Sequence, residues 1–218
     1  MKHGIVYNGE QILNVPNSIT ITRGIMMIGS SVAIVLGGPN LYPALIYAAG
    51  AIGDGLDGIS ARVLKQKTEF GKKLDPFVDA TSFVAGLTAL TITSPELNER
   101  LLLTSALVVQ TLYSSHLTYK WKGISDDKKK ELGPSIIGKT KTAIMMMSLV
   151  KLMGGKHFLE DLQQFLGTYG IQFLEGNLEQ MDATLHSASL GGVGIGIMGT
   201  LWCWYNYNKK ANKILEQK

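Results

Sequence analysis

Four aspartates lie close together in the sequence, and apolar segments flank them on both sides. They form two pairs: Asp54 and Asp57 are three residues apart, and Asp75 and Asp79 are four residues apart. At that spacing the members of each pair fall on one face of a helix. Carboxylates inside or against segments that could enter a bilayer are costly and by default indicate function. Two such faces brought together would offer oxygen ligands to hard divalent cations.

Small residues share the faces that carry the aspartates. Gly58 and Ala61 continue the face of the first pair, and Gly71 precedes the second pair by one turn. They leave room for a bulky ligand beside the carboxylates. Arg62 follows directly, and its guanidinium is suited to a phosphate because it presents a rigid fork of donors. The pattern therefore predicts a metal site with space for a phosphate.

The composition narrows the class of protein. The chain has 218 residues, the length of one ordinary domain. Its one cysteine, Cys203, excludes an internal disulfide, and no zinc-ligand spacing is present. No cleavable signal peptide is expected, because the first residues lack an apolar core segment. The net charge of +4 does not indicate nucleic acid, because the charges gather in a few clusters between apolar runs.

Six apolar stretches approach the roughly 20 residues that a helix needs to cross a bilayer. They are Ser18–Leu36, Leu41 to about Leu64, Leu74–Thr93, Leu101–Tyr119, Thr140 to about Met153, and Leu185 to about Tyr207. The fifth is the shortest and reaches the required length only if neighbouring polar residues join its helix. The sequence therefore predicts an all-α membrane protein, a single domain over residues 1–218 with six transmembrane helices in one bundle.

The basic residues predict the orientation of these helices. An even number of spans puts both termini on one side, and nearly all lysines and arginines fall on or beside that side. Only Arg100, Lys151 and Lys156 are left for the other side, where the segment 160–182 carries five acids and no lysine or arginine. The excess of basic residues predicts cytoplasmic termini. It also places the four aspartates at the cytoplasmic face, where nucleotides and magnesium are available.

Two further segments have a structural interpretation. Apolar residues recur between positions 157 and 182, and they predict an amphipathic element that lies on the outer surface or against a dimer partner. The last span carries Gly192, Gly196 and Gly199, a small-residue spacing suited to close contact between helices.

The acidic stretch resembles the signature of the CDP-alcohol phosphatidyltransferases, D-x2-D-G-x2-A-R-x8-G-x3-D-x3-D. All eight fixed positions match without a gap between Asp54 and Asp79. The resemblance implies an integral membrane enzyme that transfers the phosphatidyl group of CDP-diacylglycerol to a small polar alcohol and releases CMP. It further implies two Mg²⁺ or Mn²⁺ ions as cofactors and a homodimer.

The resemblance also implies roles for individual residues. In the family, the positions that match Asp54, Asp57 and Asp75 coordinate the metals, and the position of Asp79 touches the second metal and acts as general base on the acceptor hydroxyl. The sequence by itself does not rank Asp79 above Asp75 as the base. The residues expected to bind the nucleotide or the CDP-lipid are Asn17, Thr20, Gly58, Ala61, Arg62, Thr68 and Gly71.

Three of these residues have an alternative interpretation. Asn17 and Thr20 follow Pro16 at the entry to the first span, where the segment that begins with Asn17 can cap the helix. In the family a similar entry helps to line the nucleotide pocket. Thr68 matches a hydroxyl position that relatives use for the nucleotide, and it is otherwise an ordinary loop threonine.

The acceptor alcohol is indicated by a second, weaker motif. Gly138–Thr142 reads G-K-T-K-T and looks like the G-K-x-K-T stretch of phosphatidylglycerophosphate synthases, in which the lysines bind the phosphate of glycerol 3-phosphate. By that resemblance Lys139 and Lys141 bind the acceptor phosphate. The alternative is that both lysines extend to an interface and only their stems are buried.

One departure leaves the acceptor open. Many relatives have an arginine late in the fourth span, whereas this chain has none there. His116 or Lys120 could replace it, and the alternative is a histidine that a neighbouring helix satisfies. The acceptor alternatives are an inositol phosphate, phosphatidylglycerol or another polyol.

Two other classes of membrane protein compete with this interpretation. Intramembrane prenyltransferases also use aspartate pairs and magnesium, but their acidic motifs lie far apart in sequence, whereas one short loop joins the pairs here. A non-catalytic scaffold or a transporter would explain the apolar spans. It would not explain why Gly58, Ala61, Arg62 and Gly71 accompany the acids.

Overall fold

The computed structural model describes residues 6–7, 10–12, 14–121, 136–169, 171 and 176–216. These residues form seven helices and one short antiparallel strand pair. The elements are β1 (Val6–Tyr7), β2 (Glu10–Gln11), α1 (Val15–Gly37), α2 (Leu41–Val63), α3 (Glu69–Thr93), α4 (Leu97–Trp121), α6 (Ile136–Met153), α7 (Phe158–Gly167) and α8 (Leu178–Glu216). The prediction of an all-α chain is confirmed apart from the two-residue strands.

Each of the six apolar stretches lies in a long helix of its own. Several helices extend beyond the apolar part: α3 begins at Glu69, and α8 continues to Glu216. The polar extension that the fifth stretch requires is present, because α6 begins at Ile136 and has 18 residues. Among the described helices, α1 and α3 are long and apolar enough to cross a membrane by length and composition.

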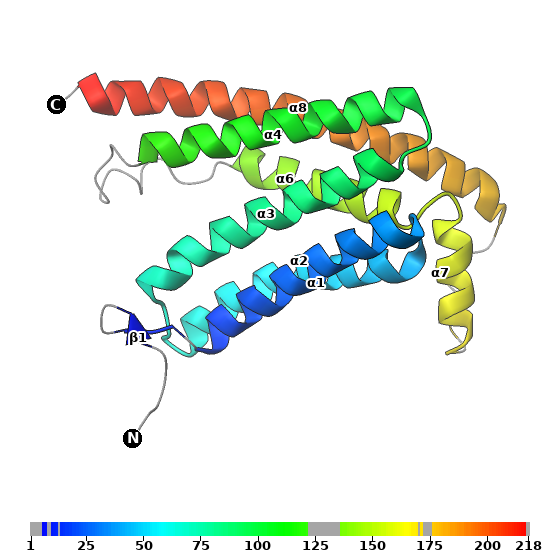
Figure 1. Ribbon diagram of the computed structural model, residues 1–218, viewed down its shortest axis with the longest axis horizontal. Helices are drawn as coiled ribbons and strands as arrows, with labels where there is room; N and C mark the ends of the chain where they lie inside the picture. The colour runs from blue at the N-terminus through cyan, green and yellow to red at the C-terminus, as the bar shows by residue number, and fades with distance from the viewer. Residues whose placement is uncertain are drawn as a thin grey trace.

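The long helices lie alongside one another, and α1 contacts both α2 and α3 (Figure 1). The other close pairs are α6 with α8, α3 with α4, and α4 with α8. Their shared core is apolar and includes Met27, Tyr47, Leu87, Leu149 and Val193. Close packing of these side chains gives the van der Waals contacts that hold such helices together, in lipid as well as in water.

Three glycines of α8 pack closely against α6, as the sequence predicts: Gly192, Gly196 and Gly199. A Cβ added at Gly192 would lie 2.2 Å from the Ser148 hydroxyl, and one at Gly196 would lie 2.0 Å from Met145 Cγ. Any larger side chain would therefore separate the two helices. The contact sets the position of α6, the helix that carries Lys139 and Lys141, against α8.

The two ends of the molecule differ in what they contain. The start of α1, the end of α8 and the connection from α2 to α3 all lie at one end (Figure 1). The short helix α7 lies at the opposite end and crosses the direction of the long helices. There the ring of Phe165 meets Tyr42 of α2 edge to face, with centroids 6.5 Å apart.

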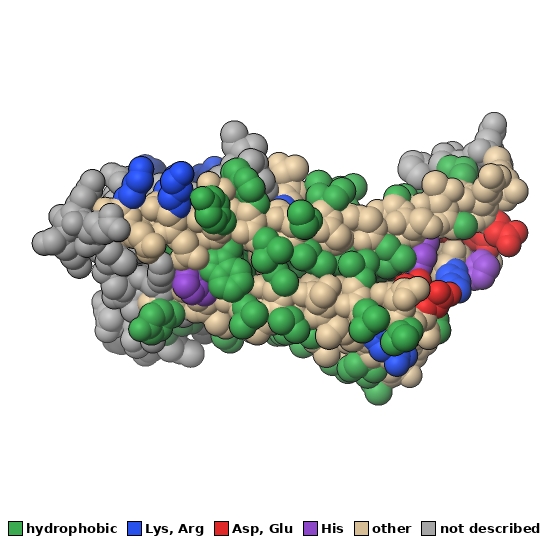
Figure 2. Space-filling view, turned by 90° about the horizontal axis from the view of Figure 1, so that it is seen from above, with side chains coloured by type: hydrophobic (Ala, Val, Ile, Leu, Met, Phe, Trp, Pro, Cys, Tyr) green, Lys and Arg blue, Asp and Glu red, His purple; other side chains and the backbone are tan. Residues whose placement is uncertain are grey.

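One face of the molecule shows how the side chains are distributed along its length. Hydrophobic side chains cover the middle of this face, whereas charged and histidine side chains gather toward the two ends (Figure 2). Large apolar residues are exposed on several helices, among them Ile25, Ile52, Ile92 and Met198. This distribution suits a surface surrounded by lipid between two polar boundaries.

Candidate active site

The last turns of α2 and the first turns of α3 carry the four aspartates. The chain leaves α2 through Lys65, which has a positive φ of 53°. It enters α3 at Thr68, whose side chain accepts a hydrogen bond from the Gly71 amide at 3.0 Å. That N-cap satisfies one of the free amides at the start of the helix. The tight connection brings the two acidic faces together, as the sequence predicts.

Three of the carboxylates are spaced as metal ligands. Asp54, Asp57 and Asp75 can each place one oxygen within 4.8 Å of the others. Asp57 is the buried member of the cluster, with a side chain that is 7% exposed, whereas Asp54 and Asp75 are about half exposed. Hard oxygen donors that converge at an accessible site fit Mg²⁺ or Mn²⁺, and Mg²⁺ commonly keeps several waters and substrate oxygens beside one or two carboxylates.

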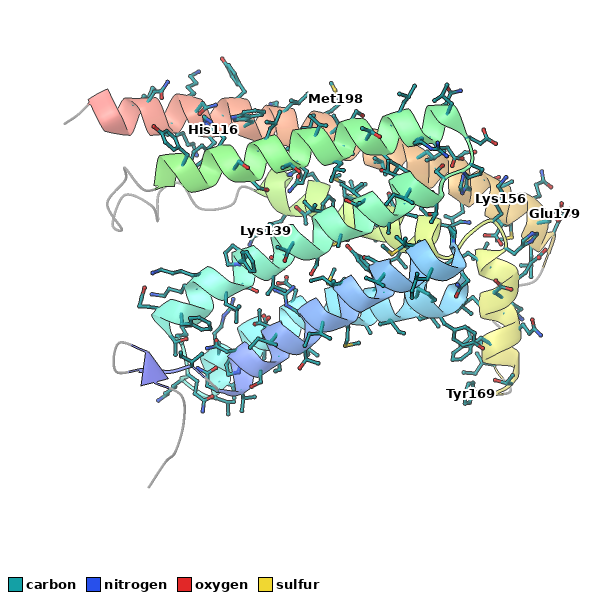
Figure 3. All side chains as sticks on the ribbon, in the orientation of Figure 1. His116, Lys139, Lys156, Tyr169, Glu179 and Met198 are labelled. Atoms are coloured by element: carbon teal, nitrogen blue, oxygen red, sulfur yellow. The ribbon has the colours of Figure 1, made fainter. Side chains whose placement is uncertain are left out.

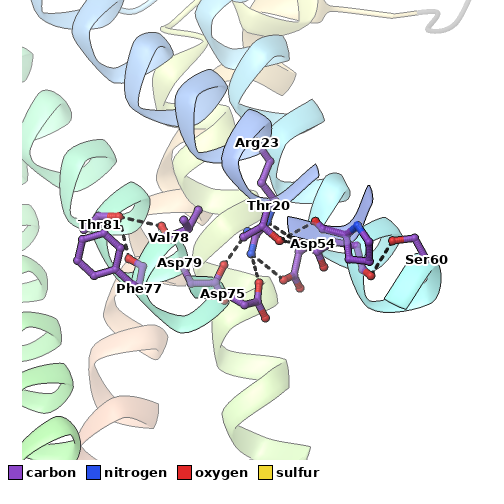
Figure 4. Close-up of polar contacts among 11 residues, drawn as sticks. Thr20, Arg23, Asp54, Ser60, Asp75, Phe77, Val78, Asp79 and Thr81 are labelled. Atoms are coloured by element: carbon purple, nitrogen blue, oxygen red, sulfur yellow. Dashed lines mark hydrogen bonds and ion pairs between the residues drawn. The ribbon is translucent and has the colours of Figure 1, made fainter. Parts of the chain in front are cut away.

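Arg23 of α1 lies at the centre of this cluster and contacts all four aspartates (Figure 4). Its side chain is 3% exposed. Nε donates to Asp57 Oδ2 at 3.0 Å, and Nη1 donates to Asp79 Oδ1 at 2.6 Å. Nη2 donates to Asp75 and lies 3.3 Å from Asp54 Oδ1. Asp79 is therefore joined to the other three aspartates through the arginine.

Arg23 is not among the site residues that the sequence predicts. It was counted only among the basic residues on the predicted cytoplasmic side. A usable signal was present, because Arg23 is the only charged residue in the helix that became α1. A charge inside an apolar span indicates a functional site with a named partner.

Thr20, which the family resemblance assigns to the nucleotide, contacts Asp57 directly. Its hydroxyl donates to Asp57 Oδ2 at 2.8 Å and also lies 3.1 Å from the Pro16 carbonyl. Thr20 is buried. Thr20 therefore contacts Asp57 from the protein interior.

Asn17, Thr68 and Gly71, also expected at the nucleotide, form one joint between α1 and α3. Asn17 Nδ2 donates to Thr68 Oγ1 at 3.3 Å and to the Ile12 carbonyl at 2.8 Å. The suggestion that the segment beginning with Asn17 caps the first helix is wrong. The helix begins at Val15, and Asn14 caps it by accepting from the Asn17 amide at 2.9 Å. Pro16 fits the first turn, where its missing N–H costs nothing, so the helix starts before the apolar pattern does.

Gly58, Ala61 and Arg62 follow Asp57 in the last turns of α2. A Cβ added at Gly58 would meet no atom within 4 Å. Ala61 is partly buried and Arg62 is exposed. The space at Gly58 lies next to Asp57 in the sequence, and the room for a phosphate stays a prediction.

The two lysines expected at the acceptor have different surroundings. Lys141 is buried, and its Nζ donates to Thr200 Oγ1 of α8 at 2.8 Å. The same ammonium lies 5.1 Å from the ring centroid of Tyr113 of α4. Among the residues that the structure describes, no carboxylate pairs with it. Lys139 is exposed, so the structure does not bring the two lysines into one environment.

His116 is held by α8. Its Nε2 lies 2.7 Å from Asn208 Oδ1, and its ring is 5.4 Å from that of Trp204. A neighbouring helix therefore satisfies His116, which is the alternative interpretation of this histidine given above. The side chain of Lys120 lies outside the described part of the chain.

Comparisons with known proteins agree with this geometry. Residues 13–174 match the profile of the CDP-alcohol phosphatidyltransferases. A protein of Wigglesworthia glossinidia brevipalpis is 29% identical over 166 residues, which cover 72% of this chain and 86% of that protein. A protein of Sodalis glossinidius (strain morsitans) is 30% identical over 150 residues, which cover 65% of this chain and 77% of that protein. Both relatives are named CDP-diacylglycerol–glycerol-3-phosphate 3-phosphatidyltransferase.

The profile match extends from the residues just before α1 to beyond α7, and it includes Arg23 and all four aspartates. It covers well over half of the chain. The chain therefore belongs to the CDP-alcohol phosphatidyltransferase family.

Proposed function

We propose that this protein transfers the phosphatidyl group of CDP-diacylglycerol to glycerol 3-phosphate, which gives phosphatidylglycerophosphate and CMP. The observation that carries the proposal is the convergence of Asp54, Asp57 and Asp75 within 4.8 Å of one another, at an accessible site of a chain that belongs to this family. The names of the two relatives support glycerol 3-phosphate as the acceptor.

In the proposed reaction the acceptor hydroxyl attacks the phosphorus that carries the diacylglycerol. A new P–O bond forms to the acceptor, the P–O bond to CMP breaks, and CMP leaves with the electron pair. Asp79 would accept the proton of the attacking hydroxyl, because its partly exposed carboxylate can reach a substrate at the cluster.

The four aspartates would hold two Mg²⁺ or Mn²⁺ ions, which when bound supply positive charge to the attacking and leaving oxygens. Asp57, buried and fixed by Thr20 and Arg23, sets the position of the cluster. Gly58 and Ala61 leave space for the nucleotide, and Arg62 is available to its phosphates. Asn17, Thr68 and Gly71 would act by holding the start of α3 against α1.

Lys141 supports an acceptor that carries a phosphate. A buried ammonium without a carboxylate partner is costly, and a phosphate would supply the missing negative charge. We therefore assign Lys141 to binding of the acceptor phosphate. Lys139, which is exposed, would meet the acceptor on its way to Lys141. The absence of an arginine late in α4 keeps an inositol phosphate, phosphatidylglycerol or another polyol as outcomes of the test.

The proposal includes a membrane topology. The six long helices would cross the bilayer, with both termini and the aspartates at the cytoplasmic face. The exposed apolar side chains, the charges toward the ends in Figure 2 and the distribution of basic residues support it. A homodimer is expected from the family.

The decisive experiment measures CMP release from CDP-diacylglycerol by the purified protein in detergent. We expect release that requires glycerol 3-phosphate and Mg²⁺ or Mn²⁺ and that stops when EDTA is added. Asp79→Asn should lower the rate by about 10²- to 10⁴-fold, the usual contribution of a general base. The matched control is Glu179→Gln, an exposed acid near the end where α7 lies (Figure 3), which should retain the full rate.

An acceptor panel read by lipid mass identifies the product. Phosphatidylglycerophosphate as the main product supports the proposal. A product from inositol phosphate, phosphatidylglycerol or another polyol would show that the acceptor is a different alcohol, while the transfer of the phosphatidyl group from CDP-diacylglycerol would stand. The absence of CMP release with every acceptor would instead favour a non-catalytic scaffold or a transporter.

A further inference from the structure

Arg23 is the residue whose contacts the proposed chemistry does not explain. Its guanidinium uses all three nitrogens on carboxylates: Nε on Asp57, Nη1 on Asp79, and Nη2 on Asp75 and Asp54 (Figure 4). These four partners come from two helices, α2 and α3, whereas the arginine comes from a third, α1. One cation therefore holds both acidic faces in place.

The charges explain why such a cation is needed. Four carboxylates converge there, and like charges at this separation repel each other strongly when they are partly removed from water. Arg23 keeps its charge at any accessible pH and is almost fully buried. It neutralises part of the cluster, but one positive charge against four negative charges leaves the site able to attract further cations.

Arg23 and a bound divalent ion would share the same carboxylates. The three residues spaced as metal ligands are Asp54, Asp57 and Asp75. Nη2 contacts two of them, Asp54 and Asp75, through their Oδ1 atoms. An ion held among the three would bind carboxylates that the guanidinium now contacts, so the two cations would compete for the negative charge of this part of the cluster.

The stem of Arg23 is held, and only its head group can exchange partners. A Cβ added at Gly53 of α2 would lie 3.3 Å from Arg23 Cβ and 3.6 Å from its Cδ. The stem therefore runs against the glycine face of α2. The contacts of Nε with Asp57 and of Nη1 with Asp79 can persist while Nη2 gives up its two partners.

We propose that Arg23 is a built-in counterion of the aspartate cluster. Without metal, Arg23 holds the carboxylates at the spacing of metal ligands. When a divalent cation binds, Arg23 gives up its contacts with Asp54 and Asp75. Arg23 is thus a positioning residue that acts through the metal ligands. This inference rests on the proposed function, because it takes the aspartates as the metal site.

The test measures equilibrium Mn²⁺ binding and thermal unfolding of the full chain in detergent, without substrate. Arg23→Gln removes the competing charge, so its half-saturating Mn²⁺ concentration should fall by about tenfold, within the range typical of coupled sites. Its unfolding temperature in EDTA should fall, because the carboxylates lose their counterion, and added Mn²⁺ should raise it by more than in the unchanged protein. Arg100→Gln is the matched control: Arg100 donates to the Ser94 carbonyl, away from the aspartates.

A second variant keeps the test decisive if Arg23→Gln does not fold in EDTA. Arg23→Lys retains the charge but cannot bridge Asp54, Asp75 and Asp79 with a rigid fork, so its Mn²⁺ affinity should lie above that of the unchanged protein. Folding of Arg23→Gln only when Mn²⁺ is present would also support the proposal.

The outcomes separate the two proposals. If the unchanged protein binds no Mn²⁺, the metal site of the proposed function is wrong. If it binds Mn²⁺ and both Arg23 variants bind it equally or more weakly, the metal site stands and the role of Arg23 is wrong.

Discussion

Asn17 of α1 donates its side-chain amide to the hydroxyl of Thr68, the N-cap of α3, over 3.3 Å. The same hydroxyl accepts from the Gly71 amide at 3.0 Å. These contacts fix the first turn of α3 to the first turn of α1. Because α3 carries Asp75 and Asp79, the joint sets where one half of the aspartate cluster lies.

Gly71→Ala should loosen this joint. The added Cβ would lie 2.5 Å from Asn17 Oδ1, so either the Asn17 side chain must leave its place in the joint or α1 and α3 must move apart. Overpacking of this kind typically costs about 1–3 kcal/mol. We expect a lower unfolding temperature in detergent and slower CMP release. The control is Gly29→Ala on α1, where a Cβ meets nothing within 4 Å and a helical alanine is favoured over glycine; equal unfolding temperatures of the two variants would contradict the prediction.

Lys141→Met should weaken binding of the acceptor selectively. Loss of a hydrogen bond from a charged group costs about 1.5–3 kcal/mol, or about 10- to 150-fold in affinity. We expect the KM for glycerol 3-phosphate to rise by that factor while the KM for CDP-diacylglycerol changes little. Lys139→Met should have a smaller effect, because Lys139 is exposed. Steady-state kinetics with each substrate varied in turn measures both, and an equal rise in the two KM values for Lys141→Met would speak against a phosphate site.

The positions of the long helices, and the approach of the acidic residues of α2 and α3 to each other, could be predicted from the sequence for a simple reason. Asp54 to Asp79 lie on two consecutive helices joined by a short loop, so helical spacing alone brings their acidic faces together. Arg23 lies on a third helix, and the rotation of α1 relative to α2 and α3 depends on side-chain packing that no local pattern states. The same limit applies to Lys141, whose contacts with Tyr113 and Thr200 come from two other helices.

The charges at the opposite end of the molecule show a further limit. Orientation by basic residues left Lys151 as an exception on the outer side. The structure shows that Lys151 is buried and paired with Asp182, 3.0 Å away. Positive-inside counting treats each lysine as free, so it cannot recognise one that is neutralised within the protein.

Glu99 at the start of α4 should make stability depend on pH. It precedes the apolar part of that helix and accepts from Ser94 Oγ at 2.7 Å, and its other oxygen lies 2.9 Å from His186 Nε2. Burial acts to raise the pKa of Glu99, but the hydrogen bonds from His186 and Ser94 outweigh it and hold this pKa below the usual value. A lowered folded-state pKa gives stability that is fully present above the ordinary glutamate pKa of about 4.3 and is lost as the pH falls through the lower folded value.

Glu99→Gln removes that contribution. Its unfolding temperature should lie below that of the unchanged protein near neutral pH, and the difference should shrink as the pH falls below the ordinary glutamate pKa. Thermal unfolding of both proteins across this pH range checks the prediction, and a difference that stays constant with pH would refute it.

Lys151 and Asp182 should be the costliest pair to break. Lys151 Nζ lies 3.0 Å from Asp182 Oδ1 and donates to the Gly155 carbonyl at 2.8 Å, and Asp182 Oδ2 accepts from the Leu159 amide at 2.8 Å. The pair thus connects α6, the start of α7 and α8. Lys151→Met leaves a buried carboxylate without its counterion, which typically costs about 3–5 kcal/mol.

The double variant Lys151→Met with Asp182→Leu removes both charges, so it should recover much of that loss, because an apolar replacement of a buried pair is often neutral. Denaturant titrations of the single and double variants in detergent form a cycle that isolates the interaction between the two residues. The exposed pair His157–Glu160, 3.0 Å apart, is the control, and His157→Gln should change the unfolding free energy by less than about 1 kcal/mol. If the losses in the two single variants simply add in the double variant, the two charges are not coupled, and the connection between α6 and α8 rests on their other contacts, such as the packing around Gly192 and Gly196 and the hydrogen bond from Lys141 to Thr200.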